Sequence, residues 1–168
     1  MNQLTDEQIQ SHISGALGDN FKILRDDYGI FTIELPVPQL YRCIQFLYKD
    51  SLLEFNYLTD LCGVHYPDEK GRELAVVYHL QSMRNSTRMR IKTFVPIEKP
   101  EIPSITGIYA SANWMERETY DFYGILFLGH PDLRRILNMD EMVDFPMRKE
   151  FPLEDPLRAD KKDLHFGR

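Results

Sequence analysis

The part of the sequence best suited to chemistry is a run of charged residues between positions 116 and 135, ERETYDFYGILFLGHPDLRR. Carboxylates and a histidine can exchange protons as general acid and base, or can ligate a divalent metal ion. Carboxylates and arginines can instead pair with one another and fix the shape of a protein surface. The run therefore predicts a catalytic site, a metal site or a docking surface. The residues considered for these roles are Glu116, Arg117, Glu118, Asp121, His130, Arg134 and Arg135.

A catalytic or metal-binding arrangement would combine Glu116, Glu118 and His130, as in a free-standing metal-dependent hydrolase. The two-residue and longer spacings between them do not prescribe a single site. His130 lies in a Gly-His-Pro turn, where the ring usually hydrogen-bonds to neighbouring backbone or carboxylate groups. Arg117 and Asp121 are four residues apart, which is the spacing of ion pairs on one helix face. The residue types therefore favour a structural network over a catalytic site.

Aromatic residues in the same region point to binding as well. Trp114, Tyr120, Phe122 and Tyr123 could stack on a flat ring such as flavin or quinone. At helical spacing, however, aromatic side chains more often belong to a core or an interface. Trp114 close to Arg117 is the pairing found at interface hot spots.

The motifs of common cofactor and hydrolase sites are absent from the sequence. No GxGxxG follows a predicted strand and no GxxxxGKS/T occurs, which weighs against binding of NADH, FAD or ATP. HExxH and GxSxG are missing too. Cys43 and Cys62 are too few and too far apart for a zinc or iron–sulfur motif. We expect them to be reduced thiols in a cytosolic compartment.

Composition predicts a folded domain that does not bind nucleic acid. The chain has 168 residues, of which 43% are hydrophobic and 27% charged, as in ordinary globular proteins. The net charge of -6 provides no positive field to attract nucleic acid or an anionic bilayer. The N-terminus lacks the pattern of a secretory signal, and apolar runs such as 124–129 are too short to cross a bilayer. Any membrane association is therefore expected to come through partners.

The first half of the chain predicts two helices around a hairpin. Thr5 and Gln8 form a capping box before a helix over residues 6–17. Alternating apolar residues at 21–23 and 31–35 predict two antiparallel strands. An amphipathic pattern then predicts a helix over residues 39–49.

Three strands are predicted next, over residues 53–61, 73–81 and 88–95. Their core faces are expected to be Leu53, Phe55, Tyr57, Thr59 and Leu61 in the first strand, Leu74, Val76, Tyr78 and Leu80 in the second, and Met89, Ile91, Thr93 and Val95 in the third. The opposite face of the last strand carries Arg88, Arg90 and Lys92. This row of cations is either solvated or an electrostatic docking strip.

A third helix is predicted over residues 104–124, and the charged, proline-containing segment after it has no helical or strand period. The order of elements predicts an α+β fold, with helices packed on a two-layer, mostly antiparallel or mixed sheet of about five strands. We expect a single domain over residues 1–137. Residues 138–168 are expected to form an extended tail, poorly ordered alone and ordered against partner subunits.

The charged run resembles the signature of the thirty-kilodalton subunit of respiratory NADH:quinone oxidoreductase, complex I. The matching residues are ERE at 116–118, DFYG at 121–124 with its Gly124, His130, Arg134 and IL at 136–137. Similar segments are NYLTD, ELAVVYHL, RMRIKTFVP and ANW before the signature, and FPMRKEFPLED after it. The resemblance covers residues 53–155 well, and it is to the separate form of the subunit, not to forms fused to the large quinone-site subunit.

The resemblance implies a scaffold subunit of the hydrophilic arm, with no catalytic, cofactor-binding or metal-binding residue of its own. FMN, iron–sulfur clusters and quinone would be bound by partner subunits, namely the large quinone-site subunit and the cluster-bearing chains. The complex would lie peripherally on the cytoplasmic side of the inner (plasma) membrane and would couple electron transfer from NADH to ion translocation. The charged signature residues and Gly124 would then fix the surface that the partner recognises.

Three other hypotheses remain open. Related subunits serve in membrane-bound hydrogenases and in quinone oxidoreductases with other electron donors, and the identity of co-purifying subunits would separate these from complex I. A metal-dependent hydrolase using Glu116, Glu118 and His130 would bind a metal ion and act alone. A general soluble adaptor would form a complex without membrane association.

Overall fold

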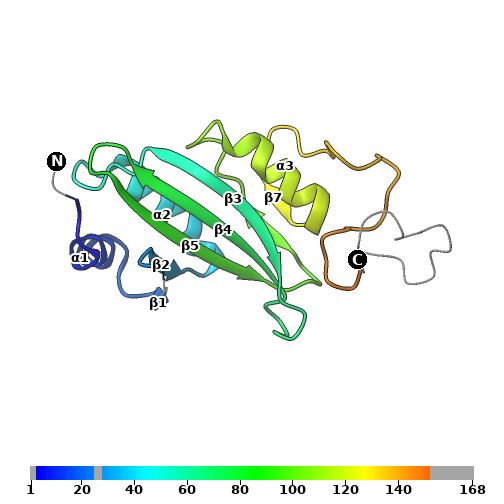
Figure 1. Ribbon diagram of the computed structural model, residues 1–168, viewed down its shortest axis with the longest axis horizontal. Coiled ribbons are helices and arrows are strands. Elements are labelled where there is room, and N and C mark those ends of the chain that lie inside the picture. The colour runs from blue at the N-terminus through cyan, green and yellow to red at the C-terminus, as the bar shows by residue number, and fades with distance from the viewer. Residues whose placement is uncertain (1–2, 25–27, 152–168) are drawn as a thin grey trace, which may run out of the picture.

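The computed structural model describes residues 3–24 and 28–151 (Figure 1). It contains three helices among these residues, α1 (Asp6–Leu17), α2 (Val37–Lys49) and α3 (Ala112–Tyr123). The strands are β1 (Lys22–Leu24), β2 (Phe31–Glu34), β3 (Tyr57–His65), β4 (Leu74–Ser82), β5 (Thr87–Val95), β6 (Glu101–Pro103) and β7 (Leu126–Leu128). In Figure 1, α2 lies behind the long strands β3, β4 and β5, and α3 lies beyond β3.

The main sheet has five strands in the order β1-β2-β5-β4-β3. All neighbouring pairs are antiparallel except β2 and β5, which run parallel. The predicted α+β fold with a mixed, mostly antiparallel five-stranded sheet is therefore confirmed. A separate parallel pair, β6 and β7, was not predicted, because three-residue strands are too short to show a sequence period.

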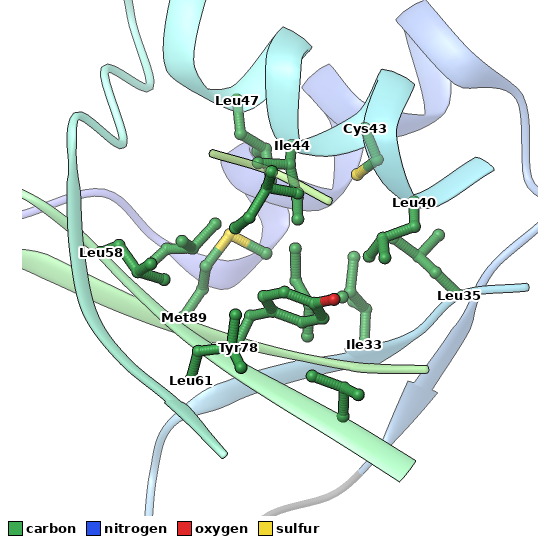
Figure 2. Close-up of a cluster of buried hydrophobic side chains, with 14 of the residues drawn as sticks. Ile33, Leu35, Leu40, Cys43, Ile44, Leu47, Leu58, Leu61, Tyr78 and Met89 are labelled. Carbon is green, nitrogen blue, oxygen red and sulfur yellow. The ribbon is translucent and has the colours of Figure 1, made fainter. Parts of the chain in front are cut away.

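The first two helices form where the sequence predicts them. Gln8 N donates to Thr5 Oγ1 at 3.3 Å and Thr5 N donates to Gln8 Oε1 at 3.0 Å, which confirms the capping box. Helix α2 begins at Val37, two residues before the predicted start at Gln39. Pro38 fits there because the first turn of a helix needs no N–H donor. Buried side chains of α2 (Leu40, Cys43, Ile44 and Leu47) meet Ile33, Tyr78 and Met89 of the sheet in the core (Figure 2).

The predicted core face of the first long strand is correct for Leu53, Phe55 and Leu61, which are buried, but wrong for Tyr57 and Thr59, which are exposed. The strand begins at Tyr57 instead of Leu53, and its register against β4 shifts between Leu58 and Asp60. Such a bulge adds one residue and moves the following side chains to the other face. Leu58 and Leu61 are therefore both buried, whereas Tyr57 is exposed. The predicted core faces of β4 and β5 are correct.

The third helix is shorter than predicted. It begins at Ala112, and residues 104–111 form turns instead of helix. Ser104 N donates to Leu128 O at 2.9 Å, which extends the pairing of β6 with β7 by one residue. One side of this segment nonetheless faces the core, since Ile105, Tyr109, Ala112, Glu116 and Thr119 are all buried.

Residues 138–151 contain no helix or strand, as the sequence predicts, but they pack on α3 of the same chain. Met147 N donates to Phe122 O at 3.2 Å. The domain boundary at residue 137 and the docking of the tail stay predictions. His165 and the tail segment from Pro152 onward lie outside the described residues.

Candidate functional site

The end of α3 is fixed against the sheet by two close contacts at glycines. Gly63 of β3 lies directly against the Tyr123 ring, and a Cβ at this position would approach the ring to 2.5 Å. Gly124 ends the helix with a left-handed backbone (φ 75°), which glycine adopts without strain. A Cβ on Gly124 would meet the ring of Phe145 at 2.5 Å. The signature glycine thus lets residues 145–148 pack directly on the helix end.

Asp121 is the centre of the site. Its carboxylate is fully buried, and its Oδ2 accepts from three successive backbone N–H groups, Ile136 at 3.0 Å, Leu137 at 2.8 Å and Asn138 at 3.0 Å. Such a row of N–H groups forms a concave anion site. The Asn138 side chain and Arg135 donate to Oδ1 at 3.1 and 2.8 Å. Burial alone would raise the pKa of Asp121, but these donors hold it well below its usual range.

Arg135 continues the network away from the helix. Besides its buried ion pair with Asp121, its guanidinium donates to Met142 O at 2.6 Å and Asp144 O at 3.3 Å. Arg148 donates to Tyr123 O at 2.9 Å. Both guanidinium groups lie over the Phe145 ring, at 5.2 and 4.6 Å from its centroid. Two largely buried cations thus hold residues 135–148 in one conformation without any regular secondary structure.

The same loop exposes several of its apolar side chains. Leu137 is 65% exposed, Met139 73% and Val143 86%, although the backbone that carries them is held by buried polar groups. The carboxylates Asp140, Glu141 and Asp144 of the same segment are exposed beside them. We call residues 135–148 the docking loop. A held loop with outward apolar side chains is the form expected of an interface.

Arg117 and Arg134 lie at the start of this loop. Arg117 is buried and donates to Arg134 O at 3.2 Å and to Arg135 O at 3.4 Å. Its guanidinium lies 4.7 Å from the ring centroid of Trp114, which is 63% exposed. Arg134 pairs with Asp132 at 2.9 Å on the surface. Among the described residues Arg117 makes no ion pair with Asp121, so the predicted pairing on one helix face is not found.

Glu116 stands apart from this network. It is fully buried, and its Oε1 accepts from Ile105 N at 2.7 Å, so it links α3 to the turn after β6. Burial raises its pKa from 4.5 to about 7, although the Ser104 and Ile105 hydrogen bonds act in the opposite direction. Within the described part of the chain its Oε2 has no hydrogen-bond partner. The expected charge network therefore includes Asp121 and Arg135 but leaves Glu116 unpaired with any arginine.

The three side chains of the hydrolase hypothesis, Glu116, Glu118 and His130, lie in different surroundings. Glu118 is exposed, on a different side of α3 from the buried Glu116. His130 accepts from Asp132 N through Nδ1 at 3.0 Å, so its Nε2 carries the hydrogen and donates to Asn113 O at 3.1 Å. The ring thereby joins the turn to the first turn of α3. No three His, Cys, Asp or Glu side chains within residues 3–24 and 28–151 are placed to hold a metal ion.

Comparison with known protein families decides what kind of molecule carries this site. The family model described as "Respiratory-chain NADH dehydrogenase, 30 Kd subunit" matches residues 33–157, which include the whole cluster around Asp121. The chain belongs to this family. The resemblance of the charged run to the thirty-kilodalton subunit is thus confirmed.

Individual relatives of the 30-kDa subunit family agree with this assignment. The chain is 44% identical to a C-type subunit of NADH-quinone oxidoreductase from Rhizobium meliloti, over 84% of the chain and 76% of that protein. It is 41% identical to the C-type subunit of NADH-quinone oxidoreductase from Acidithiobacillus ferrooxidans, over 88% of the chain and 75% of that protein. These relatives are subunits of an enzyme complex.

Solved structures show the same fold. A trypsin-resistant fragment of Nqo5 superposes with a TM-score of 0.65 at 33% identity, covering 74% of this chain and 98% of the fragment. A chain of the membrane-bound sulfane sulfur reductase, an archaeal respiratory membrane complex, superposes with a TM-score of 0.73 at 23% identity, covering 88% and 85%. The latter likeness concerns the fold alone. In the described part of this family member, no helix has the length and apolarity to span a bilayer.

The predicted docking strip lies on the face of the sheet opposite the core. Arg90 donates from Nε to Nε2 of His79 at 2.9 Å, and His79 lies 3.6 Å from Asp60. Arg88 is exposed, and Lys92 is opposite Glu34 in the parallel pairing of β2 and β5. Part of the strip is therefore engaged within the sheet, and its role in docking stays a proposal.

Sequence reasoning missed several residues that build the site. Three of them were predicted only as part of an extended tail. Asn138 contacts Asp121, Phe145 lies against Gly124, and Arg148 donates to Tyr123 O. His65 accepts from Lys149 N at 2.9 Å and attaches the same segment to β3. No local period marks such residues, because each contacts a partner distant in sequence.

Proposed function

We propose that this family member is a scaffold subunit of the peripheral arm of an NADH:quinone oxidoreductase, complex I. It supports electron transfer from NADH to quinone, coupled to ion translocation, by holding neighbouring subunits in place. The redox centres, FMN, iron–sulfur clusters and quinone, are bound by those neighbours. The complex lies peripherally on the cytoplasmic side of the inner membrane.

One observation supports this proposal above the others, namely that the docking loop exposes apolar side chains on a backbone held by buried polar groups. Its two arginines, Arg135 and Arg148, contact Asp121 and Tyr123, whereas Leu137, Met139 and Val143 are exposed, as are the carboxylates of the loop, Asp140, Glu141 and Asp144. Exposing these apolar groups to water costs free energy, which burial against a partner recovers. The charged signature residues therefore act by shaping a surface and not by reacting with a substrate.

The large quinone-site subunit and the cluster-bearing chains of the peripheral arm are the partners proposed for this loop. Trp114, with Arg117 beneath it, lies next to the start of the loop through Arg134 and adds an exposed aromatic anchor. The strip of Arg88, Arg90 and Lys92 on the outer sheet face is proposed as a second, weaker contact. Exposed charges of this kind steer association more than they add affinity.

The test replaces the outward side chains and leaves the inward network intact. In the tagged full-length chain, the double substitution Leu137→Asp and Val143→Asp should abolish co-purification of the other subunits in mild detergent. Met83→Asp is the matched control, because Met83 is also exposed and apolar but lies in the turn between β4 and β5. Thermal unfolding of each purified chain checks that the fold is unchanged.

The wild-type pull-down also separates this proposal from its alternatives. The companions should include the quinone-site subunit, and the spectrum of the complex should show flavin and iron–sulfur clusters. The proposal is wrong if the double variant assembles as well as Met83→Asp does. It is also wrong if the purified chain alone holds a stoichiometric metal or redox centre, or turns over substrate.

A further inference from the structure

A hollow of about 380 Å³ lies between β3 and α3, beside the docking loop. Its lining is mostly apolar, with Cys62 and Gly63 from β3, Phe122 and Tyr123 from α3, and Met147 from the docking loop. Two carboxylates, Asp60 and Glu118, also line it. The hollow thus combines an apolar interior with a negative charge, and none of the roles assigned above uses it.

The walls of this hollow are fixed in place. The Tyr123 ring lies so close to Gly63 that no larger residue fits between the helix and the strand. Met147 is held by the hydrogen bond from its N–H to Phe122 O at 3.2 Å, and the neighbouring Arg148 donates to Tyr123 O at 2.9 Å. A pocket that is formed before binding loses little entropy when it is filled, so it favours tight contact with an inserted group.

The acidic groups leave a charge to be matched. Asp60 is near His79, at 3.6 Å, but Glu118 makes no ion pair or hydrogen bond among the residues that the structure describes. Both carboxylates act on the pocket interior: burial and then the charge of Asp60 raise the pKa of the Cys62 thiol, the charge of Arg90 lowers it, and the charge of Glu118 adds a smaller rise. A cationic group placed here would be attracted to Glu118 without having to displace an internal partner.

Met147 connects the hollow to the docking loop, because it belongs to both. A partner that covers the outward side chains of the loop would therefore reach the hollow as well. Resting on the function proposed above, we propose that the hollow receives an apolar side chain of the partner subunit, next to a lysine or arginine that pairs with Glu118. This occupant fits both the apolar walls and the unmatched carboxylate.

The two cysteines of the chain supply the test. Cys62 lines the hollow and is partly exposed, whereas Cys43 is fully buried in the core, where burial raises its pKa to about 12. N-ethylmaleimide is applied at about pH 8.5 to the isolated full-length chain and to the complex purified in mild detergent, and alkylation at each cysteine is followed by mass spectrometry. Cys62 should react in the isolated chain and at least about tenfold more slowly in the complex, whereas Cys43 should stay unmodified in both.

Charge reversal tests the cationic half of the occupant. Glu118→Lys should reduce the yield of assembled complex and restore alkylation of Cys62 in whatever complex forms, and Glu118→Gln should have a smaller effect. Glu98→Lys is the control, because it makes the same change of charge at an exposed position in the turn after β5. If Glu118→Lys and Glu98→Lys behave alike, no cation pairs with Glu118 and the inference is wrong.

The remaining outcomes separate this inference from the proposed function. If the complex assembles but Cys62 reacts there as fast as in the isolated chain, the hollow is empty and only this inference fails. If no subunit of a respiratory complex co-purifies, both fail. Protection of Cys62 already in the isolated chain would identify a different occupant and overturn the inference. If the protection rises with the concentration of the chain, the occupant is a second copy of the chain. If gel filtration removes the protection, the occupant is a small molecule. If neither happens, the occupant is another part of the same chain.

Discussion

Glu116 offers the sharpest prediction because it is a buried acid with a perturbed pKa. Burial raises that pKa from 4.5 to about 7. Each pKa unit corresponds to about 1.4 kcal/mol, so ionising Glu116 in the folded chain costs about 3 kcal/mol more than in the unfolded chain. The variant Glu116→Gln keeps an oxygen that can accept from Ile105 N at the position of Oε1, but it cannot ionise.

The sign of the pH dependence follows from the direction of the pKa change. Between about pH 4.5 and pH 7 the folded state binds a proton at Glu116 that the unfolded state has released, so stability falls as the pH rises. The stability that protonated Glu116 provides is fully present below pH 4.5 and is lost as the pH rises to about 7. Relative to Glu116→Gln, the wild-type chain should therefore lose about 3 kcal/mol across this range and change little above it.

Urea unfolding of both purified chains at several values between pH 4.5 and 8.5 measures this difference. Glu118→Gln is the matched control, since it removes a carboxylate from an exposed position on the same helix. A wild-type minus Glu116→Gln difference that is flat with pH would refute the argument. So would a difference that grows more favourable to the wild type as the pH rises.

The remaining predictions concern the helix end and its contacts. Because the pKa of Asp121 is depressed, the stability that its carboxylate provides is present above the ordinary pKa of about 3.9 and is lost as the pH falls below it. Asp121→Asn should therefore lower the free energy of unfolding at pH 7 by about 3 kcal/mol in urea titrations. The free energy of unfolding of this variant should also fall less on acidification than that of the wild type. Gly124→Ala should destabilise the chain by about 2 kcal/mol or more in thermal unfolding, because it combines a left-handed backbone with a steric clash. Its counterpart Gly15→Ala, within α1 and facing open space, should stabilise by about 0.5–1 kcal/mol. Gly63→Ala should cost about 1–3 kcal/mol by forcing the Tyr123 ring away, and adding Tyr123→Leu should recover part of that loss in a double-mutant cycle. Equal stability of the alanine variants at positions 124 and 15, or strict additivity at positions 63 and 123, would contradict these contacts.

Local sequence features were sufficient for most of the secondary structure. Residues 6–17 carry both a capping box and an apolar stripe, and they form a helix with those bounds. Strand β5 alternates in the sequence and in burial over nine residues, and the predicted core face of β4 is buried too, although Ala75 and Val77 on its other face are buried as well. In such elements each residue's environment depends on neighbours two to four positions away, so the pattern is visible in the sequence.

Elements that depend on distant partners were predicted less well. The bulge at Leu58 is fixed by pairing with β4, and Ser104, where the third helix was predicted to begin, instead continues the pairing of β6 through its bond to Leu128 O. Neither partner is near in the sequence. Regular spacing of apolar residues therefore predicts that a segment forms a helix or strand. It does not predict where contact with a distant strand shifts the register or ends the element.

The candidate site was likewise predictable in part from local sequence and in part only from the tertiary structure. The sequence by itself determined the family, because the residue types and spacing of residues 116–137 match it, and that family is confirmed. Only the tertiary structure decided which charges meet. Asp121 binds Arg135 and three N–H groups beyond it, Arg117 holds the loop backbone, and Glu116 is buried apart from both. The physical reason is that a charge in a protein pairs with whatever group the fold brings within about 3 Å, and spacing along the chain fixes that partner only within a single helix or strand.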